Sequence, residues 1–204
     1  MRSAQDLDVL AAGTSLSSTV LPSRVLSTTA PRRQRALWLA LSVAVVIVIV
    51  DQATKAWADR RLLAGSCSAA PDACIDLFWT ARLHLHYNPG AAFSTGRGLG
   101  PLFGVIAFVM AGILLNIART RTDRLGPALL GAISGGAIGN LIDRVVRAED
   151  GFLSGEVIDF IDFQWWPIFN VADSGVVVGV VAFVIYSFIA PDDDAGELSA
   201  ASGG

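Results

Sequence analysis

The sequence of 204 residues contains few of the residues that most hydrolases use for nucleophilic or metal-dependent catalysis. It has two histidines, two cysteines and only 16% charged residues. No Gly-x-Ser-x-Gly elbow and no His-Glu-x-x-His helix occurs, so the patterns typical of serine hydrolases and zinc peptidases are missing. His84 and His86 alternate and could share the face of a strand, but no further metal ligand accompanies them. We therefore expect no metal, no cofactor and no nucleic-acid partner.

Hydrophobic residues, in contrast, are abundant and occur in long runs. They make up 53% of the chain, and the mean hydropathy of +0.56 is too high for an ordinary soluble domain of this length. The apolar runs at 36–50, 101–118, 125–146 and 168–190 predict four membrane-spanning helices. A cleaved secretory signal peptide is the alternative for the first run, but three further spans follow it.

The positions of basic residues predict the orientation of these spans. Arg32, Arg33 and Arg35 precede the first span, and a short basic loop at 119–124 joins the second span to the third. By the positive-inside rule, this loop and both termini are cytoplasmic, and the connection at 59–100 lies outside. We expect a four-span domain at 36–190 in a cell membrane, with flexible cytoplasmic tails at 1–35 and 191–204.

The long outer connection and the third span have local patterns of their own. Residues 75–78 and 83–87 read as short strands of a small sheet that lies on the membrane. Cys67 and Cys74 are in the same connection, and either free thiols or a disulfide would fit there. In the third span, glycines at positions 131, 135 and 139 allow a neighbouring helix to approach closely.

A cluster of polar residues stands between the third and fourth spans, at the predicted outer surface. Such groups are costly near hydrocarbon unless they are paired or hydrated, so they indicate a functional site. Asp51 and Lys55, four residues apart near the same surface, are either an ion pair with Lys55 reaching the headgroups or a support of that site. The cluster consists of Asn140, Asp143, Arg144, Asp159, Asn170 and Asp173.

The cluster suits acid–base chemistry better than nucleophilic chemistry. Ser174 is the nearest hydroxyl, but without a base close by we expect it to bond to its own helix backbone. Two carboxyl groups that share one proton can instead activate a water and protonate a carbonyl, as in aspartic proteases. The alternatives are a proton or ion carrier, whose acids should be spread through the bilayer depth, and a structural four-helix protein whose polar residues only lock helices together.

Five blocks of the sequence, in this order, resemble the lipoprotein signal peptidases, or signal peptidase II. The resemblance implies an all-α membrane protein with four transmembrane helices and a small extracytoplasmic β-sheet. It also implies an aspartyl endopeptidase that cuts a prolipoprotein just before a Cys carrying a diacylglyceryl group. The blocks are Asp51-Gln52-x-x-Lys55, Asn88-Pro89-Gly90-Ala91-Ala92-Phe93, Gly135 to Arg144, Val157-Ile158-Asp159-Phe160, and Phe169-Asn170-Val171-Ala172-Asp173-Ser174.

The same resemblance assigns a role to each residue of the cluster. Asp159 and Asp173 would be the catalytic pair, and Asp162 is the alternative partner for Asp173. A physical argument agrees, because Arg144 and Arg147 should keep Asp143 ionised whereas apolar neighbours flank Asp159. Residues expected to bind the substrate backbone or hold the pair are Asn88, Gly90, Asn140, Arg144 and Asn170, with Asp51, Lys55 and Asp143 in support.

The expected partners follow from this chemistry. They are a lipidated prolipoprotein as substrate and the membrane lipid around it, and we expect the protein to act as a monomer. Asparagine side chains offer both a donor and an acceptor to a peptide whose backbone groups water cannot reach. The segment 88–93 is predicted to cover the substrate groove.

Overall fold

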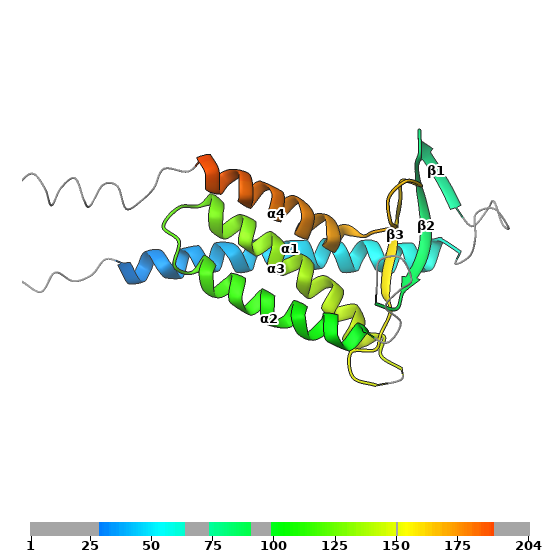
Figure 1. Cartoon of the computed structure of the whole chain (residues 1–204), viewed down its shortest axis with the longest axis horizontal. Helices are drawn as coiled ribbons and strands as arrows, with labels where there is room; N and C mark the ends of the chain where they lie inside the picture. The colour runs from blue at the N-terminus through cyan, green and yellow to red at the C-terminus, as the bar shows by residue number, and fades with distance from the viewer. Residues whose placement is uncertain (1–28, 64–73, 91–98, 150, 190–204) are drawn as a thin grey trace, which may run out of the picture.

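A computed structural model describes residues 29–63, 74–90, 99–149 and 151–189, which form a four-helix bundle with a small sheet at one end (Figure 1). The helices are α1 (Thr29–Arg61), α2 (Gly100–Ala118), α3 (Leu125–Val146) and α4 (Val171–Ile189). All four are long and apolar enough to cross a membrane. The four spans predicted from the sequence are therefore confirmed, and the end of the bundle that carries the sheet is called the sheet end below.

Two helix boundaries differ from the prediction. α1 begins at Thr29, so residues 29–35, which we expected in a flexible tail, are helical. Pro31 suits this start, because a proline in the first turn needs no intrahelical donor. α4 begins at Val171 rather than at residue 168, because Asn170 caps it and Pro167 lies just before.

α3 is the central helix, and it packs against α1, α2 and α4. A Cβ atom added to Gly135 would stand 2.7 Å from the carbonyl oxygen of Ala44 in α1, and one on Gly131 would meet the backbone of Ala40. Only glycine leaves room for such a close approach. The predicted role of the glycine spacing in helix packing is confirmed.

The sheet has the antiparallel order β1-β2-β3 and consists of β1 (Cys74–Phe78), β2 (Ala81–Asn88) and β3 (Val157–Asp162). The first two strands are those predicted. The sequence did not indicate β3 as a strand, whereas it pairs with β2 and places His86 opposite Asp159. Cys74 is disulfide-bonded, and Cys67 lies outside the described residues.

A small apolar core joins the sheet to the bundle. Ala58 and Leu62, near the end of α1, pack against Leu85 of β2 and against Ile158 and Phe160 of β3. These five side chains are at most 5% exposed. Burial of this core holds β3 at a defined height above α1 and α3.

Candidate active site

The start of α4 is a reciprocal cap that contains one of the two predicted catalytic acids. The side-chain Oδ1 of Asn170 accepts a hydrogen bond from the backbone N–H of Asp173 at 2.9 Å. In return, the Asp173 carboxylate accepts one from the backbone N–H of Asn170 at 3.2 Å. This is a capping box with Asn and Asp in its two places, and it fixes the Asp173 carboxylate at the positive end of a helix.

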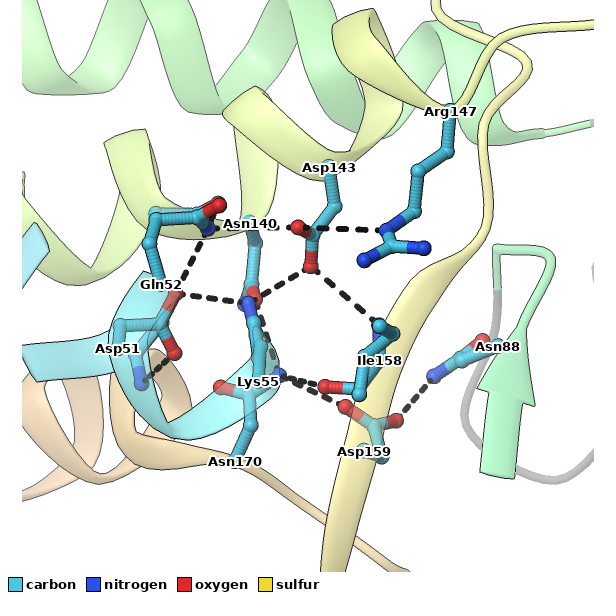
Figure 2. A network of polar contacts seen from close by, with 12 residues as sticks. Asp51, Gln52, Lys55, Asn88, Asn140, Asp143, Arg147, Ile158, Asp159 and Asn170 are labelled. Carbon is cyan, nitrogen blue, oxygen red and sulfur yellow. Dashed lines mark hydrogen bonds and ion pairs between the residues drawn. The ribbon is translucent and has the colours of Figure 1, made fainter. Parts of the chain in front are cut away.

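The other predicted acid, Asp159, lies on β3 and is 2% exposed. Its carboxylate accepts hydrogen bonds from Nδ2 of Asn170 at 2.7 Å and from Nδ2 of Asn88 at 3.0 Å (Figure 2). Asn170 therefore contacts both acids, through its side chain at Asp159 and through its backbone at Asp173. One asparagine thus sets their relative position.

Asn140 of α3 connects the acid pair to the interior of the bundle. Its Nδ2 donates to Asp173 at 2.7 Å, while its Oδ1 accepts from Nδ2 of Asn170 at 3.0 Å and from Nζ of Lys55 at 2.9 Å. The lysine can only donate, so the amide must direct its oxygen toward Lys55 and its nitrogen toward Asp173. Lys55 thereby orients a donor to the acid pair without contacting either acid.

Lys55 itself is buried among charges. Its side chain is 1% exposed, and Nζ lies 2.8 Å from the carboxylates of both Asp51 and Asp143 (Figure 2). The i,i+4 ion pair with Asp51 is confirmed, but the alternative in which Lys55 reaches the headgroups is wrong. Packing of α3 against α1 brings Asp143 to the lysine and closes it off from the surface. A buried charge of this kind is stable only because it is paired.

The two supporting acids also hold neighbouring backbone groups. Asp51 accepts a hydrogen bond from the backbone N–H of Ala172 in the first turn of α4 at 2.9 Å. Asp143 accepts one from the backbone N–H of Ile158, next to Asp159, at 3.3 Å. Asp51 therefore connects α1 to the start of α4, which carries Asp173. Asp143 connects α3 to β3, which carries Asp159.

One residue of this network was quoted in a sequence block without a role. Nε2 of Gln52 donates to the carbonyl oxygen of Gly139 at 3.1 Å and lies 3.2 Å and 3.3 Å from the carboxylates of Asp51 and Asp143. The signal in the sequence that could have indicated this contact is a polar residue beside Asp51, within a long apolar run.

The place of Arg144 fits its predicted binding role, which stays a prediction, but its expected pairing with Asp143 differs. We expected it to neutralise Asp143, but in the described part of the chain the cations paired with Asp143 are Lys55 and, at 3.8 Å, Arg147. Arg144 instead lines a pocket that Asp159 also lines, so Asp159 is less remote from positive charge than its sequence neighbours suggested. Its buried Nη1 atom has no hydrogen-bond partner among the described residues.

That pocket has a volume of about 350 Å³ and opens at the sheet end between α2, α3 and α4. Its wall is mostly apolar, and its polar side chains gather at one place. This combination is typical of a site that binds a largely apolar ligand and acts on one polar group of it. The polar lining residues are Asn88, Asn140, Arg144, Asp159 and Asp173, and Gly90 also lines it.

The electrostatics of the pocket favour a protonated carboxyl group. Burial, and secondarily the negative charge of Asp173, raise the pKa of Asp159 from 3.8 to about 7. The hydrogen bonds from Asn88 and Asn170 act in the opposite direction and are outweighed. Two acids that share a site cannot both ionise easily, so one proton is retained near neutral pH.

Two further predictions near the pair can be compared with the structure. Asp162, the alternative partner of Asp173, pairs instead with Arg82 at 2.7 Å, at the far end of β3 from Val157. The hydroxyl of Ser174 donates to the backbone carbonyl of Asn170 at 3.1 Å, as expected for a helix residue. Of the segment predicted to cover the groove, residues 91–93 lie outside the described residues.

The chain is similar to known proteins over most of its length. A model of the family described as signal peptidase (SPase) II matches residues 43–189. The chain belongs to the signal peptidase II family. All of the residues named above as the acid pair and its network lie inside the matched range. The family also makes the chain a membrane-bound bacterial peptidase.

Individual relatives extend the likeness beyond the family model. A lipoprotein signal peptidase of Mycobacterium avium is 37% identical over 179 residues, which are 85% of this chain and 93% of that protein. One of Rhodococcus jostii is 42% identical over 112 residues, 55% of this chain and 56% of that protein. A solved structure of a bacterial membrane enzyme has a TM-score of 0.61 at 28% identity, covering 73% of this chain and 87% of that one. The likeness to this membrane enzyme therefore extends over about three quarters of the chain.

Proposed function

We propose that the protein is an aspartic endopeptidase that removes the signal peptide of diacylglyceryl-modified prolipoproteins, cutting just before the lipidated Cys. The observation that carries the proposal is the sharing of Asn170 between Asp159 and Asp173, the two acids that line a mostly apolar pocket between membrane-spanning helices. The names of the relatives and the family support the substrate class. The geometry supports the aspartic type.

In the proposed reaction the two acids have complementary roles. Protonated Asp159 donates its proton to the scissile carbonyl oxygen, while the Asp173 carboxylate takes a proton from the attacking water. The tetrahedral intermediate then collapses: the C–N bond breaks, the amine leaves with the proton held by Asp173, and one hydroxyl proton of the intermediate returns to Asp159, which restores both acids to their starting states. The raised pKa of Asp159 supports this assignment of the proton.

The remaining residues of the pocket have binding and supporting roles in this proposal. The unpaired Nη1 of Arg144 can donate a hydrogen bond to a backbone carbonyl of the substrate. The side chain of Asn88 donates to Asp159 and can also contact the substrate. Asp51, Lys55 and Asp143 hold Asn140 and the start of α4. The acyl chains of the substrate stay in the bilayer while its peptide enters the pocket from the side.

We also propose the orientation given by the basic residues. Arg121 and Arg124 lie in the loop at the end of the bundle opposite the sheet (Figure 1), and Arg32, Arg33 and Arg35 are on the first turns of α1 at that end. By the positive-inside rule that end faces the cytoplasm, so the sheet end and the acid pair face the outer leaflet. Both termini are then cytoplasmic.

The acid pair is tested by changing Asp159 or Asp173 to Asn and measuring cleavage of a lipidated prolipoprotein in membranes. Each change removes one acid–base function, so we expect cleavage to fall by about 10²–10⁴-fold. Asp162→Asn is the matched control, because this buried carboxylate is on the same strand but pairs with Arg82. Undiminished cleavage by a correctly inserted Asp159 or Asp173 variant would contradict the proposal.

Asp143→Asn separates support from catalysis. This variant keeps Asp159 and Asp173, so we expect a smaller loss of cleavage than in Asp173→Asn. Because Asp143 also accepts from the N–H of Ile158, its correct folding must be checked by resistance to proteolysis in the membrane. Equal and complete loss in a folded Asp143→Asn protein would make Asp143 a catalytic candidate.

A further inference from the structure

Two aromatic turns at the sheet end are more exposed than a soluble surface would favour. Phe78 and Trp79, at the turn between β1 and β2, are 71% and 89% exposed. Trp165 and Trp166, in the connection from β3 to α4, are 66% and 55% exposed. Neither the acid pair nor its network uses these four side chains, which we call the aromatic patch.

The two turns are fixed to each other. Nε2 of Gln164, next to Trp165, donates to the backbone carbonyl of Thr80, next to Trp79, at 3.0 Å. A second link joins the same segments, since Nε of Arg82 lies 2.7 Å from the Asp162 carboxylate. The patch is therefore one surface built from segments more than eighty residues apart in sequence.

The position of the patch relates it to the bilayer. In Figure 1 both turns lie at the sheet end, beyond the start of α4 and outside the outline of the four helices. Along α4, exposed apolar side chains such as Val177, Val178 and Val181 face away from the bundle. The 19 residues of α4 extend about 28 Å, close to the thickness of the hydrocarbon core, so Val171 at its start lies at the headgroup boundary.

The chemistry of the patch matches that boundary. Tryptophan is enriched where hydrocarbon meets headgroups, because its ring is largely apolar while its indole N–H can still hydrogen bond. The patch continues the lipid-facing surface of α4 at the depth where such residues are favoured. The ring of Phe163 stacks on Trp165 of the patch at 5.9 Å and contacts the tilted ring of Phe169 at 5.5 Å, which links the patch to the residue before Asn170.

We propose that the aromatic patch docks into the headgroup region of the bilayer leaflet at the sheet end. The patch anchors the hairpin β1–β2 and the connection from β3 to α4 on the lipid surface. Asp159 and Asp173 lie on the two elements that this connection joins. Docking therefore sets the height of the acid pair relative to the leaflet, a property that goes beyond the proposed cleavage reaction.

The test measures the depth of Trp79 by fluorescence. The full chain, carrying Trp79 as its single tryptophan and Phe at the other four tryptophan positions, is reconstituted into phosphatidylcholine vesicles. The vesicle lipid is brominated either near the headgroup or near the chain end. We expect strong quenching by the shallow bromine, weaker quenching by the deep bromine, and little quenching by aqueous acrylamide. The matched control retains only Trp38, an exposed residue near the opposite end of α1, and should also respond to the shallow bromine.

Two results would overturn the docking. Quenching of Trp79 by acrylamide but by neither brominated lipid would place the patch in water, and protection from all three quenchers would place it against another protein or a second copy. A second measurement needs no single-tryptophan protein. The absolute fluorescence lost to the shallow bromine should be smaller when Trp79, Trp165 and Trp166 are together replaced with Phe, because only Trp38 and Trp57 remain, and an unchanged loss would show that the patch does not contact lipid. No substrate is used, so the result is independent of the proposed cleavage reaction.

Discussion

Replacement of Lys55 by Met should destabilise the protein more than any other single change in the polar network. The ammonium group is 1% exposed and lies 2.8 Å from two carboxylates that are themselves 0% and 2% exposed. Methionine keeps most of the volume of the lysine stem but leaves Asp51 and Asp143 as buried anions without their cation. Breaking a buried ion pair in this way costs about 3–5 kcal/mol.

The contacts that remain place the expected loss near the lower end of that range. Asp51 still accepts from the N–H of Ala172, and Asp143 still accepts from Ile158 and lies 3.8 Å from Nε of Arg147. We therefore expect a loss of about 3 kcal/mol in the free energy of unfolding. The assay is equilibrium unfolding in mixed micelles of increasing dodecyl sulfate content, followed by circular dichroism.

A second variant separates charge from packing. Adding Asp143→Asn to Lys55→Met removes one of the two unpaired anions, so the double variant should be more stable than Lys55→Met by about 1–3 kcal/mol. The loss in Lys55→Met should also reduce cleavage, because the amide of Asn140 loses the donor that orients it. A loss below about 1 kcal/mol, or a double variant no more stable than Lys55→Met, would refute the electrostatic reasoning.

Three further predictions concern pH, packing and the surface of the sheet. The pKa of Asp159 is raised from 3.8 to about 7, so between these pH values the folded state retains a proton that the unfolded state releases. The free energy of unfolding should therefore decrease as the pH rises from about 4 to 7. Asp159→Asn should flatten this slope in unfolding measurements. Gly135→Ala should lower the free energy of unfolding by about 1–3 kcal/mol, because its Cβ would meet the α1 backbone. The control Gly112→Ala has open space around the new methyl group and should be neutral or slightly stabilising. Tyr87→Phe removes a hydrogen bond of 2.6 Å to Asp59 and should lower thermal stability by the equivalent of about 1 kcal/mol, while an unchanged melting temperature would show that this bond contributes nothing.

The four spans could be read from the sequence because each depends on its own composition. A run of about twenty apolar residues is sufficient to predict a membrane helix. Helical spacing likewise paired Asp51 with Lys55 across one turn. This prediction needs only the period of one helix, and the structure agrees with it.

β3 could not be predicted in the same way. Val157, Ile158, Asp159 and Phe160 are all buried, so the strand lacks the alternation of apolar and polar residues that marks a half-exposed strand. Its partner β2 is about seventy residues earlier in the chain. Nothing local indicates that pairing.

The ion-pair partners that lie on different helices also could not be predicted from the sequence. Arg144 stands next to Asp143 in the chain, yet successive helical residues point in different directions, so its side chain lines the pocket instead. The cation that neutralises Asp143 is Lys55, and only the close packing of α3 on α1 brings the two together. The sequence alone thus determined the spans, the polar cluster and the family that its motifs resemble. The tertiary structure decided which charges meet, because contacts between distant elements depend on how their surfaces pack rather than on the period of either one.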